Sequence, residues 1–208
     1  MQPLLRNIAA SIDHAFQQDA TVVATTKRIP SSLIFQALRS IRPLLHDYFG
    51  GPIKCRFPGH RVEDNVGCSE PTPFRVLEYL LDFSFSRFSI PQAIGDPRTE
   101  HIYEGKFELL FAAESELGTD NEVCRDLLKL LDTRSVIRCL LFRKRRREAH
   151  IASLNGRLLH VLQHHAHFNE AQNGWLFVPL EIQHSKVHCT FHTLDADFNG
   201  FTQFINEI

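Results

Sequence analysis

Residues 106–118 form an apolar run that carries two carboxylates near its end, and this run constrains the fold more than any other part of the chain. Read as a β-strand, it sends successive side chains to opposite faces of a sheet. The two faces are then Phe107, Leu109, Phe111, Ala113 and Ser115 on one side, and Leu110, Ala112, Glu114 and Glu116 on the other. The backbones of the two acids would lie about 6–7 Å apart, because a strand rises roughly 3.3 Å per residue. Two carboxylates beside buried positions indicate a metal ion that binds both, whereas the alternative is a strand end that reaches solvent.

Composition and charge limit the class of protein. The chain has 208 residues, 43% of them hydrophobic and 23% charged, which is typical of a folded domain rather than a disordered or fibrous chain. A formal net charge of −1 excludes nucleic-acid binding through bulk positive charge, so such binding would need a local patch. Five cysteines without paired spacing favour a reducing compartment. No signal-type segment and no apolar run of roughly 18 residues is found, so we expect a cytoplasmic protein that does not enter a membrane.

An aspartate interrupts a second strand-like segment upstream of the carboxylate run. Glycines and prolines predict loops over residues 50–73 and 89–105. Between these loops, residues 80–88 are rich in aromatic and other strand-forming residues, and Asp82 stands among them. Asp82 is therefore either at a strand bend with access to solvent or an acid that faces a functional site.

A helix and a further strand are expected directly after the carboxylate run. Thr119 and Glu122 fit a capping box, so a helix should begin there. Its polar stripe of Glu122, Asp126 and Lys129 is typical of a solvated surface held by local ion pairs. Residues 135–142 are almost continuously apolar, which predicts a central strand. A helix that connects two strands favours parallel pairing between them.

The remaining elements are expected at the two ends of the chain. Apolar residues recur at helical spacing over residues 4–16 and 33–45, which predicts two packing helices. Another helix is expected from residue 151 to about residue 165, and residues 175–194 are expected to form a β-hairpin.

Five consecutive cations follow the predicted central strand. They are Arg143, Lys144, Arg145, Arg146 and Arg147. Such a run is either a solvated loop or, at the end of a central strand, a group that contacts a phosphate backbone. Both interpretations stay open from the sequence.

The order of these features resembles the core of the PD-(D/E)xK nuclease superfamily, which has the restriction-endonuclease-like fold. Asp82 lies on one strand and Glu114-Ser115-Glu116 on the next, followed by a helix and a buried strand. The last motif position is commonly lysine in that family, so Glu116 makes the chain similar to the Glu-x-Glu variant of BamHI-like enzymes. The resemblance covers residues 74–142 and implies an α/β fold with a mixed central sheet flanked by helices.

This resemblance also suggests how the chain is organised. We expect one domain over residues 1–208, with N-terminal helices in residues 1–50. The nuclease-like core would occupy residues 74–165, and a C-terminal β extension containing the hairpin would occupy residues 170–208.

Site residues follow from the resemblance in the same way. It implies that Asp82 and Glu114 coordinate Mg²⁺ or Mn²⁺, and that Glu116 holds a second ion or the attacking water. Lys129 would be catalytic, because in several branches of the family a lysine on the following helix stands in for the missing strand lysine. The family often adds an acid from an N-terminal helix, but the first 62 residues contain no glutamate. The candidates for this fourth carboxylate are Glu78, Asp13 and Asp47.

Together these features predict a hydrolase, a magnesium-dependent endonuclease that cleaves DNA phosphodiester bonds in a restriction or defence setting. Oxygen ligands favour magnesium or manganese over zinc. A homodimer is expected, because cutting two strands suits two active sites. The alternative is a catalytically inactive protein on the same fold that binds nucleic acid or another protein.

Overall fold

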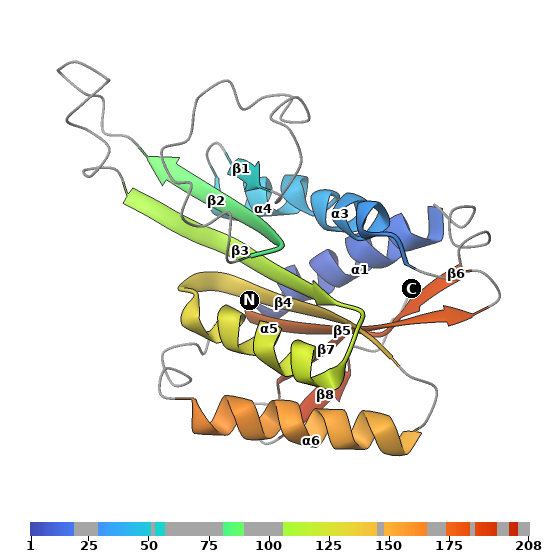
Figure 1. Cartoon of the computed structure of the whole chain (residues 1–208). Helices are drawn as coiled ribbons and strands as arrows, with labels where there is room; N and C mark the ends of the chain where they lie inside the picture. The colour runs from blue at the N-terminus through green and yellow to red at the C-terminus, as the bar shows by residue number, and fades with distance from the viewer. Residues whose placement is uncertain are drawn as a thin grey trace.

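The strands of the chain assemble into one mixed sheet with helices on both faces (Figure 1). The computed structural model describes residues 1–18, 29–50, 53–56, 81–89, 106–144, 148–165, 174–183, 186–194 and 200–203. The helices are α1 (Gln2–Gln18), α3 (Ser31–Arg39), α4 (Arg42–Phe49), α5 (Asp120–Asp132) and α6 (Glu148–His164). The strands are β1 (Ile53–Arg56), β2 (Phe83–Ser89), β3 (Lys106–Glu116), β4 (Ser135–Arg143), β5 (Gly174–Gln183), β6 (Lys186–Cys189), β7 (His192–Leu194) and β8 (Phe201–Gln203).

Connections between the strands explain why the sheet is mixed. The described strands form an eight-stranded sheet in the order β1-β2-β3-β4-β5-β7-β8, with β6 also paired to β5. β1, β2 and β3 pair antiparallel. β3 pairs parallel with β4, and β4 with β5, across the helices α5 and α6. The predicted α/β class and the parallel pairing after the carboxylate strand are therefore confirmed.

Two hydrophobic layers hold the helices against the sheet. On one face, α1, α3 and α4 pack over alternate sheet residues, and α5 and α6 cover the other face (Figure 1). β4 shows the alternation clearly, since Ile137 and Cys139 face the α1 side while Leu140 and Phe142 face the α5 side. In the part of the chain that the structure describes, no helix is both long and apolar enough to cross a membrane.

The carboxylate strand departs from strict alternation at one position. Phe85 of β2 pairs with Phe111, but the next residue, Ser86, pairs with Leu109. Leu110 is therefore an extra residue, a β-bulge that shifts the faces by one. Leu110 packs on the α1 side with Phe111, whereas Leu109 packs on the α5 side. The faces predicted for Leu109 and Leu110 were wrong, because the prediction had no bulge.

Three other element boundaries differ from the sequence-based expectation. The helix predicted over residues 33–45 is two helices, because Pro43 lacks an N–H and cannot lie inside a continuous helix. The loop predicted over residues 50–73 contains β1, whose Ile53 and Cys55 are buried. The second hairpin strand is divided into β6 and β7 opposite Pro179, which has no N–H for the ladder.

Candidate functional site

The candidate site lies where β3 ends, beside the start of β2 and the last turns of α5. Asp82 occupies a bend immediately before β2 and is partly buried. The backbone N–H of Ser115 donates to Asp82 Oδ2 at 2.9 Å, and the Ser115 hydroxyl donates to the same oxygen at 3.1 Å. The predicted bend at Asp82 is therefore confirmed, and its carboxylate is fixed against the motif strand.

Glu114 is the most unusual group in this site. It is only 1% exposed, its Oε2 accepts a hydrogen bond from Lys129 Nζ at 3.4 Å, and its Oε1 has no hydrogen-bond partner in the described part of the protein. Burial, followed by repulsion from Asp82 and Asp126, raises the pKa of Glu114 to about 8, although Lys129 opposes the shift. At neutral pH a proton or a bound cation must therefore offset the charge of Glu114.

Lys129 reaches Glu114 from the helix that follows the motif. The capping box at Thr119 and Glu122 is confirmed and sets where α5 begins. Lys129 Nζ lies 2.7 Å from Asp126 Oδ1 one helical turn away, and 38% of the Lys129 side chain is exposed. Burial by itself would lower the pKa of Lys129, but hydrogen bonds to Asp126 and Glu114 and attraction to both acids together outweigh it, so the pKa is raised and the amine stays charged.

The expectation that this polar stripe is solvated was wrong for Asp126. Asp126 is 6% exposed, and burial raises its pKa even though Lys129 opposes the shift. The helix packs with its apolar stripe on the sheet, and the neighbouring Asp126 and Lys129 are turned toward the end of β3. We call Asp82, Glu114, Asp126 and Lys129 the Glu114 cluster.

Glu116 stands at the edge of the Glu114 cluster. Its Oε1 accepts a hydrogen bond from the Gly118 N–H, and the residue is only partly buried. Burial is the main reason that the pKa of Glu116 is raised; the Gly118 bond opposes this, and repulsion from Asp126, Glu122 and Asp82 adds to it. A side chain at position 118 would place its Cβ 2.7 Å from Glu116 Oε1 and 2.6 Å from Glu122 Oε2, so a residue larger than glycine would displace the carboxylate ends of these two side chains.

The donor set for a metal ion is smaller than the three predicted ligands. Among the residues that the structure describes, no three His, Cys, Asp or Glu side chains are grouped so that they could hold one ion. Asp82 and Glu114 fit a metal ion better than the predicted set of three acids. Glu114 has an unpartnered buried oxygen, and Asp82 is held by the neighbouring Ser115. The Glu116 carboxylate instead accepts the hydrogen bond from the Gly118 amide. Mg²⁺ is commonly held by one or two carboxylates together with water and substrate phosphate.

The candidates for a fourth carboxylate do not join the cluster in the described structure. Asp13 lies on α1, on the opposite face of the sheet, and accepts a hydrogen bond from the Cys189 thiol at 3.1 Å. Asp47 lies on α4 with its side chain 80% exposed, 3.6 Å from His46 Nδ1. Glu78 is outside the described residues.

The basic run starts at the same edge of the sheet as the Glu114 cluster. Glu116 is in register with Phe142 on β4, so the next residue, Arg143, lies beside the end of the motif. The Arg143 side chain is exposed. The Lys144 N–H donates to the Leu180 carbonyl at 2.7 Å, and its amine lies 3.8 Å from Glu181 Oε2. Arg145, Arg146 and Arg147 lie outside the described residues.

Sequence reasoning did not anticipate the role of Ser115. The alternation placed it on the face away from Glu114, and nothing in a lone serine signals that it will hold Asp82. The hydrogen bonds arise because Phe83 is in register with Ala113, which brings the residue before β2 next to the end of β3.

The fold and the site together define a mixed α/β protein with a buried carboxylate and lysine cluster at the end of a central strand. Comparison of the chain with protein-family models, curated proteins and solved structures gave no match. The function is therefore inferred from the geometry of the Glu114 cluster and from the sequence motif.

Proposed function

We propose that the chain is a metal-dependent endonuclease that hydrolyses DNA phosphodiester bonds on a restriction-endonuclease-like fold. The observation that carries the proposal is the buried Glu114, which combines an unpartnered Oε1, a raised pKa and a lysine amine at 3.4 Å. A carboxylate is rarely kept in such a place for stability alone, because burying it is costly.

The arrangement of the strands supports the same proposal. Asp82 stands at the head of β2 in an antiparallel unit of three strands, and the Glu-x-Glu motif ends the third of these strands. A capped helix then leads to a parallel strand beside the motif. This is the order of acids and elements that the nuclease resemblance implies.

The site residues suit the chemistry of phosphodiester hydrolysis. Asp82 and Glu114 would hold a Mg²⁺ or Mn²⁺ ion, which would polarise the phosphate and lower the pKa of a bound water. Glu116, with its raised pKa and partial exposure, is suited to accept the proton of the attacking water. Lys129 keeps its charge and would stabilise the negative charge that develops on the phosphate, and Asp126 positions the amine.

DNA would approach from the edge of the sheet where β3 and β4 end. Arg143 is exposed there, next to the register position of Glu116, and the rest of the basic run follows in the sequence. Local cations are needed because the whole chain has a net charge of only −1. A homodimer would supply two such sites, one for each strand of a duplex.

A cleavage assay with a matched pair of variants tests the proposal. Purified protein is incubated with supercoiled and linear DNA and Mg²⁺ or Mn²⁺, and cleavage is compared between wild type, Glu114→Gln and Glu108→Gln. Glu108 lies on the same strand but pairs with Arg87, so it controls for loss of a β3 carboxylate. Cleavage by wild type and Glu108→Gln, but not by Glu114→Gln, is the expected result.

Two other outcomes would reject the proposal. Equal cleavage by Glu114→Gln and wild type would mean that the nuclease activity belongs to another site or to a contaminant. Metal-independent DNA binding without cleavage by any of the three proteins would favour the alternative, an inactive protein on the same fold.

A further inference from the structure

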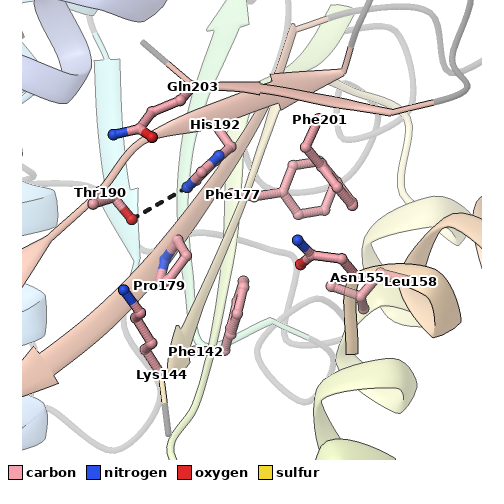
Figure 2. A pocket seen from close by; sticks show the side chains of 10 residues that line it. All are labelled: Phe142, Lys144, Asn155, Leu158, Phe177, Pro179, Thr190, His192, Phe201 and Gln203. Carbon is pink, nitrogen blue, oxygen red and sulfur yellow. Dashed lines mark hydrogen bonds between the residues drawn. The ribbon is translucent and has the colours of Figure 1, made fainter. Parts of the chain in front are cut away.

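A pocket opens on the α6 side of the sheet, beside the end of β4 and the middle of β5 (Figure 2). Its volume is about 120 Å³. Its apolar wall is largely aromatic, and Phe177 and Phe201 meet edge to face with ring centroids 4.8 Å apart. Sites for drug-sized ligands occupy roughly 300–1,000 Å³, so this pocket suits a single flat ring rather than a larger molecule.

The polar groups of the pocket come from four different parts of the chain. Asn155 projects from α6 and Gln203 from the end of β8, while Thr190 and His192 are joined by a hydrogen bond of 3.2 Å (Figure 2). Lys144, the second residue of the basic run, also lines the pocket. An amide side chain presents donors and an acceptor side by side, which matches the edge of a nucleobase.

The register of the sheet places this pocket next to the Glu114 cluster. Phe142, which lines the pocket, is in register with Glu116 on one side and with Pro179 on the other. Parallel strands lie about 4.8 Å apart, so the backbones of Phe142 and Pro179 are roughly 5 Å and 10 Å from that of Glu116. Phe142 packs on the α5 and α6 face, the face on which Glu114 meets Lys129.

We propose that this pocket binds one unpaired nucleobase, packed against Phe201 and Phe177 and hydrogen-bonded along its edge by Asn155. The proposal rests on the proposed nuclease function for its ligand, a base of the strand whose phosphate lies at the Glu114 cluster. Enzymes that take a base out of the stack hold it between aromatic or apolar side chains and contact its edge by hydrogen bonds. A base in a strand and a free nucleotide share this chemistry.

Binding measured without divalent metal tests the pocket separately from cleavage. Fluorescence anisotropy in EDTA compares three labelled duplexes, which are fully paired, carry one unpaired base, or carry an abasic residue at that position. Stacking of a base on an aromatic side chain predicts roughly tenfold tighter binding of the unpaired base than of the abasic residue. Asn155→Ala and Phe201→Ala should each reduce this preference to less than about threefold. Ser153→Ala, an exposed change on the same helix, should keep it.

A second arm identifies the source of the base. Adenosine and cytidine monophosphates are titrated as free ligands into wild type and the same variants. Saturable binding that needs Asn155 and Phe201, with no difference between the base and abasic duplexes, would support the pocket and assign it to free nucleotides. The inference is overturned if wild type shows neither a base preference nor nucleotide binding, or if both variants behave as wild type. Since no cleavage is measured, a base preference in a protein that never cuts DNA would reject only the nuclease proposal.

Discussion

Replacing Glu114 by glutamine should change how the stability of the protein depends on pH. The folded protein raises the pKa of Glu114 from its ordinary 4.5 to about 8, mainly by burial and then by repulsion from Asp82 and Asp126. A raised pKa means that the folded state keeps a proton that the unfolded state has released. The free energy of unfolding of the wild type should therefore fall as pH rises from about 4.5 to about 8.

The size of the effect follows from the same shift. One pKa unit corresponds to about 1.4 kcal/mol, so the shift of Glu114 is worth roughly 3–5 kcal/mol above pH 8. Glutamine has nearly the same shape as a protonated glutamate and carries no charge. The neighbouring acids titrate in both proteins, so the difference between the two reports on Glu114. Glu114→Gln should therefore match the wild type near pH 4.5 and be more stable by roughly 3–5 kcal/mol at pH 8.5 in metal-free buffer.

Urea unfolding followed by tryptophan fluorescence measures this difference. The single tryptophan, Trp175, is 1% exposed in β5 and reports on the core. Unfolding curves are recorded from pH 4.5 to 8.5 for the wild type, Glu114→Gln and Glu108→Gln, and Glu108→Gln should follow the wild type. A gap between Glu114→Gln and wild type that stays constant to within 1 kcal/mol over this range would refute the assigned burial and pKa of Glu114.

Three further outcomes test separate parts of the account. Lys129→Met should raise the activation free energy of DNA cleavage by about 2–4 kcal/mol and change the DNA affinity little. A variant that cleaves at the wild-type rate would show that Lys129 has no catalytic role. Arg143→Ala should reduce the slope of log affinity against log salt by about one, measured by anisotropy on several DNA sequences; an unchanged slope would place Arg143 in a solvated loop. Thr119→Ala removes the hydrogen bond to the Glu122 N–H and should cost about 1 kcal/mol in urea unfolding, whereas unchanged stability would mean that the cap is dispensable.

The motif strand shows how far hydrophobic alternation predicts a site. From Phe111 to Glu116 the alternation is regular. The Glu114 side chain points to the face of the sheet that alternation assigns to it, and α5 on that face brings Lys129 to it. The bulge at Leu110 was not predictable in this way, because it depends on how β2 pairs with β3 and not on the composition of β3 alone. Alternation therefore predicts faces only between irregularities that other strands impose.

The helix that follows the motif shows a different limit. Its start and its capping box were both predicted from the sequence, and the structure confirms them. Spacing alone could not say whether Lys129 reaches β3, because that depends on the angle at which α5 crosses the sheet. The same angle buries Asp126, which the sequence alone makes indistinguishable from an exposed helical acid.

The most direct test of the account is whether a divalent cation binds at Glu114 and displaces its proton. Calorimetric titration of Mn²⁺ or Mg²⁺ at pH 7, in two buffers of different ionisation enthalpy, measures both the affinity and the protons released. Because the pKa of Glu114 is about 8, we predict binding with release of close to one proton per ion in wild type and Glu108→Gln. Glu114→Gln should lose both. Equal binding by Glu114→Gln and wild type, or binding without proton release, would contradict a metal site at Glu114.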